Sequence, residues 1–294
     1  MKRNSKGQFI SQKEDFAWVM KSVNKDMSSA HNPKFKYPER GMVEASDWKE
    51  FNECGNGLHG FLWGEGNEGL ADFASNSRWL LIRVNPKDGL VQMKDKCKFR
   101  RGEVMMAGDY HQIASEMLKH VPSDRLYKVI GAVITRNDDS VIVGGAYSIL
   151  EGGDYSTVTG GYRSTVMGGY RSTVTGGVGS TVMGGDDSTV TGGDRSTVKG
   201  GDRSTVTGGN DSTVKGGDYS TVTGGYYSTV TGGDDSTVTG GGYSTVMGGP
   251  NSIIILEYYD GNEWKKKAGT IGENGLEPNV PYKLNDKHEF VRAK

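Results

Sequence analysis

An octapeptide repeat dominates the sequence and constrains its fold more than any other feature. Between residues 152 and 247, twelve units follow one another without a break, and each reads Gly-Gly, two variable residues, Ser-Thr-Val and a variable last residue. Degenerate units at 136–143, 144–151 and 248–255 extend the array to fifteen. A short, fixed period indicates a stack of similar structural units, so the repeat decides the architecture of this part of the chain.

The last residue of each unit reveals a second period, of sixteen residues. In alternate units it is always threonine, at Thr159, Thr175, Thr191, Thr207, Thr223 and Thr239. In the intervening units it is Met167, Met183, Lys199, Lys215, Thr231 and Met247. A flexible glycine-rich linker is the alternative interpretation of this composition. The β-branched Thr and Val favour strands instead, and a linker has no reason to alternate every sixteen residues.

The sixteen-residue period predicts a coil that contains two short strands, each followed by a Gly-Gly corner. Glycine suits the corner because it accepts positive φ and lets stacked backbones approach closely. Coils stacked about 4.8 Å apart form two parallel sheets that face each other. The predicted fold class is therefore mainly β: a two-sheet parallel β-solenoid of about seven coils over 136–255, between an N-terminal α+β domain and a small C-terminal β cap.

Side-chain alternation along each strand predicts which residues are buried. Lys199 and Lys215 cannot enter so thin a core, so the eighth and sixth residues of each unit point outward, and the Ser and Val between them point inward. One face then carries six Thr-Val-Thr strands with two rows of threonines, about 6.7 Å apart along the strand and about 4.8 Å between neighbours. The stiff χ1 of threonine favours a pre-ordered array. These pairs are Thr157/Thr159, Thr173/Thr175, Thr189/Thr191, Thr205/Thr207, Thr221/Thr223 and Thr237/Thr239.

The units Gly-Tyr-Arg-Ser-Thr-Val-Thr and Gly-Gly-Tyr-Ser-Thr-Val-Met resemble the octapeptide repeats of bacterial ice nucleation proteins, which read Ala-Gly-Tyr-Gly-Ser-Thr-x-Thr. The resemblance covers about 40% of the chain and includes the nesting of eight residues within sixteen. It implies a β-solenoid whose Thr-x-Thr face orders water, with the six threonine pairs as the binding residues and ice or ordered water as the ligand. An array this short suits the binding of existing ice better than nucleation.

The variable third and fourth residues of each unit support a competing hypothesis. They place Tyr, Asp and Arg beside a constant corner, and Tyr and Arg are favoured in protein recognition. A phage or bacterial protein could bind a host partner through this set, while the plainer interpretation is a row of solvated turn residues. The flat solenoid faces also allow a homodimer. The candidate partner-binding residues are Tyr155, Tyr170, Arg171, Arg203, Tyr226 and Tyr227.

The flanking segments are predicted to be separate from the solenoid. Residues 1–135 are expected to form an α+β domain with a partly ordered, helical arm at 1–34, strands near 78–84 and 97–104, and a helix near 109–118. This region loosely resembles uncharacterised modules fused to repeats in phage and bacterial proteins. Residues 256–294, with turns at 260–262 and 272–275, are expected to form a β-hairpin cap that protects the last coil.

Cys54, His59 and Cys97 are the candidate reactive residues of the N-terminal domain. Their spacing matches no standard zinc site with His111 or His120, and no partner that would orient His59 as a base can be named. We therefore expect buried free cysteine and a hydrogen-bonded histidine. The predictions are no catalytic residue, no metal and no cofactor. An enzyme in this domain, positioned by the solenoid, is the third and weaker hypothesis.

Charge and cysteine content limit the classes of partner and the cellular compartment that can be expected. The chain carries 35 basic and 36 acidic residues, so a nucleic-acid or membrane partner is not predicted. Two cysteines are too few for a disulfide framework and favour a reducing compartment. No apolar segment reads as a signal peptide or membrane span, so the predicted location is cytoplasmic.

Overall fold

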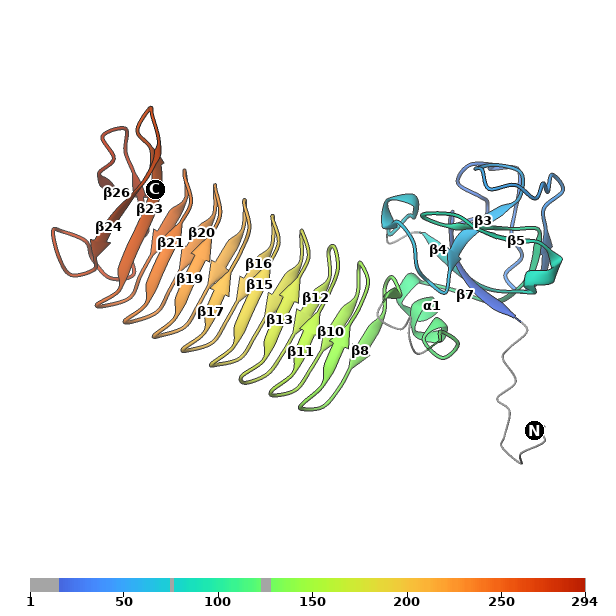
Figure 1. Cartoon of the computed structure of the whole chain (residues 1–294), viewed down its shortest axis with the longest axis horizontal. Helices are drawn as coiled ribbons and strands as arrows, with labels where there is room; N and C mark the ends of the chain where they lie inside the picture. Colours follow the sequence, from blue (N-terminus) through green and yellow to red (C-terminus); the bar gives the residue numbers. More distant parts are fainter. Residues whose placement is uncertain (1–15, 75–76, 123–127, 294) are drawn as a thin grey trace. The chain divides into compact units, whose positions relative to one another are not determined.

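The computed structural model describes residues 16–74, 77–122 and 128–293. The chain divides into two compact units between Gly131 and Ala132. Figure 1 shows a sheet domain in the first unit and a long stack of short strands in the second. The structure confirms the predicted class: mainly β, with a β-solenoid, a sheet domain before it and a small β cap after it.

The first unit is built on a seven-stranded antiparallel sheet in the order β2-β7-β4-β1-β3-β6-β5. One α-helix, α1 (Tyr110–Met117), packs on it through Ile113, Ala114 and Met117. It begins at the predicted position because Asp109 and Gln112 form a capping box. The strands are β1 (Ala17–Val23), β2 (Gly41–Glu44), β3 (Leu58–Leu62), β4 (Arg78–Val84), β5 (Leu90–Gln92), β6 (Cys97–Phe99) and β7 (Arg101–Gly108).

The helical arm predicted at 1–34 is wrong for the part that the structure describes. Residues 17–23 form β1, which lies in the middle of the sheet between β3 and β4. The run Ala-Trp-Val-Met at 17–20 is buried on both sides, so it lacks the alternation of a half-exposed strand. The polar composition of the segment concealed this short apolar run. Residues 1–15 lie outside the described residues.

The solenoid of the second unit has sixteen parallel strands, eight in each of two sheets. We call the first the threonine sheet: β9 (Val141–Val143), β11 (Thr157–Thr159), β13 (Thr173–Gly176), β15 (Thr189–Gly192), β17 (Thr205–Thr207), β19 (Thr221–Gly224), β21 (Thr237–Gly240) and β23 (Ile253–Tyr259). We call the second the mixed sheet: β8 (Val133–Thr135), β10 (Ile149–Glu151), β12 (Thr165–Met167), β14 (Thr181–Met183), β16 (Thr197–Lys199), β18 (Thr213–Lys215), β20 (Thr229–Thr231) and β22 (Thr245–Met247).

These strands make eight coils rather than about seven, because β8 precedes the first recognisable unit. Each residue pairs with the residue sixteen positions later, as Thr173 does with Thr189. The inward-facing prediction is also correct. The seventh-position valines from Val158 to Val246 form one buried cluster that Ile142, Leu150 and Ile254 continue at its ends, and the serines beside them are buried as well.

The serine column is a hydrogen-bonded ladder. The N–H of Ser164 donates to Oγ of Ser180 in the next coil at 3.1 Å. The Ser180 hydroxyl in turn donates to the carbonyl oxygen of Gly161, in the preceding coil, at 3.1 Å. The same pair of bonds recurs along the stack. Each serine hydroxyl in these pairs is therefore hydrogen-bonded, and it also accepts a backbone N–H that an apolar side chain would leave unpaired.

The corners differ from the prediction in one respect. The Gly-Gly pairs do not adopt positive φ; the fourth residue of each unit does, with φ from 51° to 63° at its non-glycine members. The glycines are needed for space. A Cβ on Gly192 would lie 2.4 Å from a Val198 methyl, and a Cβ on Gly177 would lie 2.7 Å from the carbonyl carbon of Gly161.

Aspartate at the third position extends the corner along the stack. Oδ1 of Asp186 accepts the N–H of Asp202 in the next coil at 2.9 Å. Oδ1 of Asp154 accepts the N–H of Tyr170 in the same way at 2.8 Å. The frequent Asp at this position therefore supplies an acceptor to the backbone of the following corner, which is a structural role.

The C-terminal cap covers the end of both sheets. β24 (Trp264–Thr270) pairs antiparallel with β23, and β25 (Tyr282–Leu284) joins β22 to β26 (Phe290–Arg292). Ile271, Leu276 and Tyr282 add to the solenoid core. The last parallel strands thus do not end as open edges.

No helix among the described residues is long and apolar enough to cross a membrane.

Candidate functional site

Six Thr-Val-Thr strands lie side by side in the threonine sheet. β11, β13, β15, β17, β19 and β21 pair in direct register, so their sixth-position threonines form one row and their eighth-position threonines another. Valines on β9 and isoleucines on β23 continue the two rows at either end. We call these twelve threonines the TVT face.

The side chains of the TVT face point to solvent. Sixth-position threonines are exposed from Thr157 to Thr221, and Thr237 is half-buried next to the cap strand. The valine between each pair is fully buried, which fixes the strand against the core. Backbone N–H groups are engaged within the stack, as when Thr189 donates to the Ser172 carbonyl at 3.0 Å. In residues 128–293 no hydroxyl of the TVT face bonds to another protein group, so these hydroxyls are available to water.

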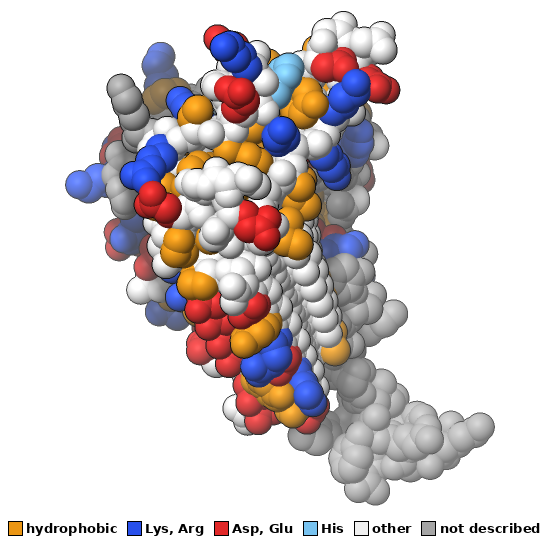
Figure 2. Space-filling model, turned by 90° about the vertical axis from the view of Figure 1, so that its left-hand side faces the viewer, with side chains coloured by type: hydrophobic (Ala, Val, Ile, Leu, Met, Phe, Trp, Pro, Cys, Tyr) orange, Lys and Arg blue, Asp and Glu red, His pale blue; other side chains and the backbone are white. Residues whose placement is uncertain are grey.

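The outer face of the mixed sheet lacks this regularity. Its eighth-position row reads Met, Met, Lys, Lys, Thr, Met along the stack, with Met183 beside Lys199 and Lys215 beside Thr231. Figure 2 shows straight rows of uncharged side chains along the solenoid, next to an edge where charged and apolar side chains gather. The TVT face is the homogeneous surface of the two.

The six candidate partner-binding residues do not form one surface. Tyr155, Tyr170, Arg171 and Arg203 precede strands of the threonine sheet, whereas Tyr226 and Tyr227 precede β20 of the mixed sheet, so they lie on opposite edges of the coil. The sixteen-residue period was the signal that could have separated them.

Several of these corner side chains interact with each other. Tyr155 packs edge-on against Tyr170 at 5.7 Å between ring centroids, and the Arg171 guanidinium lies 5.0 Å from the Tyr170 ring. Arg203 forms a 2.9 Å ion pair with Asp187, one coil earlier. These contacts between corner side chains of neighbouring coils therefore use part of the surface that could bind a partner.

The structure separates the three candidate residues of the first unit. Cys54 and His59 line a cleft of about 450 Å³, but Cys97 is buried in β6. Burial raises the pKa of the Cys97 thiol to about 12. Among the described residues no three His, Cys, Asp or Glu side chains are grouped to hold a metal.

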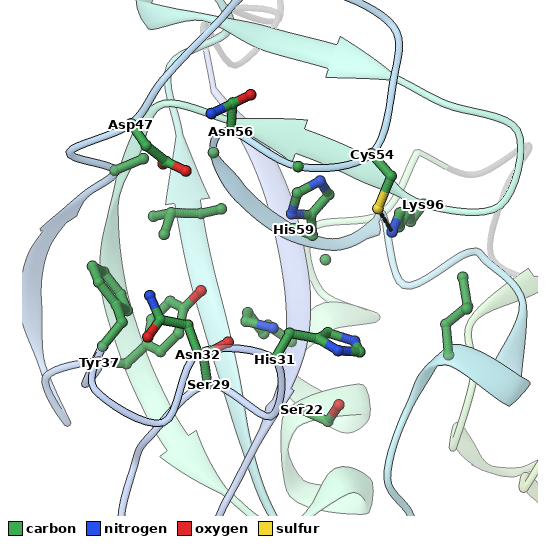
Figure 3. Close-up of a pocket in the computed structure, with 18 of the residues that line it drawn as sticks. Ser22, Ser29, His31, Asn32, Tyr37, Asp47, Cys54, Asn56, His59 and Lys96 are labelled. Carbon is green, nitrogen blue, oxygen red and sulfur yellow. Dashed lines mark hydrogen bonds between the residues drawn. The ribbon is translucent and has the colours of Figure 1, made fainter.

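Lys96, which the sequence did not single out, changes the pKa of the Cys54 thiol. Lys96 Nζ donates to Cys54 Sγ at 3.0 Å and lowers the pKa of that thiol. Figure 3 shows the two side chains next to His59 at the cleft. Burial, followed by the charges of Lys96 and Lys21, lowers the pKa of His59 to about 4. The hairpin between β5 and β6 brings Lys96 close to Cys54. No local sequence motif predicts this contact.

The expected hydrogen bond of His59 is missing at one nitrogen: Nε2 is buried and has no partner among the described residues. The other two histidines considered have structural contacts. His111 Nδ1 lies 2.9 Å from the Gly131 carbonyl oxygen, and His120 stacks on Trp18 at 3.7 Å.

The repeat array is similar to known protein sequences. No family model matches the chain, and no solved structure matches it significantly. Over 109 residues the chain is 30% identical to the ice nucleation protein InaU of Pantoea ananas and 35% identical to InaA of the same organism. An ice nucleation protein of Enterobacter agglomerans is 30% identical over a stretch of the same length.

These matches cover 37% of this chain but only 8–10% of the relatives. The matches and the sixteen-residue coils confirm the resemblance seen in the repeat units. The chain thus carries a β-solenoid array similar to the repeats of bacterial ice nucleation proteins.

Proposed function

We propose that this is a non-enzymatic repeat protein that binds ice, or an ordered layer of water, on the TVT face. The observation that carries the proposal is the pair of in-register threonine rows, whose hydroxyls bond to no protein group among the described residues. The names of the similar proteins refer to ice nucleation, which supports the same ligand.

The geometry of the rows favours ordered water over a flexible ligand. Neighbouring threonines repeat about every 4.8 Å across the strands and about every 6.7 Å along them. Each position presents a methyl group and a hydroxyl in a restricted rotamer, so little side-chain entropy is lost when water orders against the array. A flat surface with this two-dimensional period matches a lattice better than it matches a small molecule.

The size of the TVT face distinguishes ice nucleation from adsorption to existing ice. Six strands span on the order of 25 Å along the stack. Because a nucleating surface must organise a large patch of water, this short array suits adsorption to ice that already exists. We therefore propose ice binding rather than nucleation.

The test uses the full chain and two double variants. Thr189→Lys with Thr205→Lys places two long cations on adjacent strands of the TVT face. The matched control, Thr181→Lys with Thr197→Lys, makes the same change at adjacent, equally exposed sixth positions of the mixed sheet. Thermal hysteresis and partitioning into a growing ice front are measured, with circular dichroism as the check of folding.

We expect the first variant to lose ice affinity and the control to retain it. No activity in the unmodified protein at high micromolar concentration would refute the proposal. Equal loss in both folded variants would show that the TVT face is not the binding surface.

The proposal includes a reducing, cytosolic location and no catalytic role for the first unit. The two free thiols, Cys54 and Cys97, support the reducing location. Cell fractionation tests the location. Cys54→Ala and His59→Ala variants should leave ice affinity and every cellular phenotype of the protein unchanged if the cleft has no catalytic role.

A further inference from the structure

An aromatic cleft of about 500 Å³ lies within the second unit, between the corner of the last coils and the cap. This volume is in the range of small-molecule sites, roughly 300–1,000 Å³. The aromatic residues that line it are Tyr243, Tyr258, Tyr259, Trp264 and His288. None of them belongs to the TVT face.

The rings are held in place by each other and remain open to solvent. Trp264 packs against Tyr226 and Tyr259, with ring centroids 5.2 Å and 5.5 Å away. Tyr243 stacks on Tyr227 at 5.1 Å. Nevertheless Tyr243 is 75% exposed and Trp264 is 47% exposed. Large aromatic rings left exposed but fixed in orientation are typical of a binding surface.

Gly242 shows that the corner is adapted to the tryptophan. The other units between residues 152 and 247 have Asp, Asn, Tyr or Val at this third position, but this unit has glycine. A Cβ at Gly242 would lie 2.8 Å from one ring carbon of Trp264 and 3.1 Å from a ring carbon of Tyr226. The exception in the repeat therefore coincides with the place where the indole of β24 lies against the coil.

The polar groups of the cleft are varied and balanced in charge. Glu257 is 3.5 Å from Lys266, which neutralises it. Lys283 and Asp286 have opposite charges, and neither forms an ion pair within residues 128–293. In the same part of the chain, the hydroxyls of Tyr243 and Tyr259 and the indole N–H of Trp264 bond to no protein group. The cleft thus combines apolar ring faces with free donors and acceptors and no net charge.

We propose that this cleft binds a neutral oligosaccharide. A pyranose ring has an apolar face of C–H groups, which stacks on Tyr and Trp rings, and hydroxyls at its rim that both donate and accept hydrogen bonds. A quaternary ammonium ligand also prefers aromatic cages, but this cleft has no net negative charge to favour a cation. The saccharide site is independent of the ice-binding proposal, because it uses other residues on another surface.

The experiment titrates the full chain with neutral trisaccharides built from glucose, N-acetylglucosamine or xylose, by calorimetry and by tryptophan fluorescence. Binding of at least one, with a change in emission that is absent from Trp264→Phe, is expected. Trp264→Ala should raise Kd at least tenfold. Gly242→Asp keeps every ring but displaces the indole, and it should weaken binding to a similar extent.

Matched controls are Tyr155→Ala and Tyr219→Ala, which remove exposed tyrosines from the opposite edge of the coil and should bind as the unmodified protein does. Retained binding in Gly242→Asp and Trp264→Ala would overturn the assignment of the site. No trisaccharide binding at millimolar concentration, or binding of tetramethylammonium instead, would overturn the saccharide proposal. The Thr189→Lys, Thr205→Lys variant should bind saccharide normally, so a failure of either proposal is distinguishable from a failure of the other.

Discussion

Removing one hydroxyl from the serine ladder tests whether its hydrogen bonds, rather than its volume, hold adjacent coils together. Ser180→Ala removes the acceptor of the Ser164 N–H and the donor to the Gly161 carbonyl, both at 3.1 Å. The Gly161 oxygen keeps the N–H of Gly177 at 3.2 Å, so it stays satisfied. The N–H of Ser164 is left without an acceptor.

The expected loss follows from burial. Ser180 is 2% exposed, so water cannot replace the hydroxyl. A buried N–H without a partner costs about 1–3 kcal/mol. At roughly 2–4 °C per kcal/mol for a unit of this size, the melting temperature should fall by about 2–12 °C. Urea unfolding followed by circular dichroism measures the change in free energy directly.

Ser148→Ala is the matched control. Ser148 is 1% exposed and belongs to the same column, but its Oγ has no hydrogen-bond partner among the residues that the structure describes. Its replacement should leave the free energy of unfolding unchanged or slightly raise it. Equal destabilisation in the two variants would show that lost volume dominates. A Ser180→Ala variant as stable as the unmodified protein would refute the role of the ladder.

Three further outcomes test the corners and the cleft of the first unit. Gly177→Ala should destabilise the solenoid by about 1–3 kcal/mol in urea unfolding, because the new Cβ meets backbone only 2.7 Å away; an unchanged midpoint would contradict the packing argument. Arg195→Val should destabilise the solenoid in the same assay, because φ is 56° and a β-branched side chain fits this conformation less well than arginine; Arg195→Asn should be neutral or slightly stabilising. Lys96→Met should raise the pKa of Cys54 and so move its alkylation by iodoacetamide to higher pH, since the thiolate is the reactive form. Mass spectrometry measures that rate, and an identical pH profile in the variant would disprove the control by Lys96.

Local periodicity made the solenoid predictable. The alternation of buried Ser and Val with outward Thr, Met or Lys is a property of every extended strand, so sixteen residues of sequence already describe the coil. The TVT face follows from the same reasoning, because identical residues sixteen positions apart must stack. The prediction of the short cap also depended on local turn signals.

The first unit was less predictable because its sheet is built from distant segments. β1 pairs with β4, about sixty residues later in the chain, and nothing in the local pattern of 17–23 indicates that partner. Lys96 reaches Cys54 for the same reason. Such contacts depend on the route of the whole chain, and a single sequence contains no repeated signal that reveals them.

What the sequence by itself determined is the repeat unit, its inward and outward residues, and the array of threonines. What only the tertiary structure decided is how neighbouring coils constrain each corner. The preceding coil excludes a Cβ at the second glycine of the pair, and the Ser and Val of the same unit exclude one at the first. The fourth residue takes the positive φ. Contact with the cap strand explains the one glycine at Gly242 that stands where other units have a side chain. The physical reason is that backbone hydrogen bonds between coils set their spacing, and this spacing leaves no room for a Cβ at the second glycine of the pair.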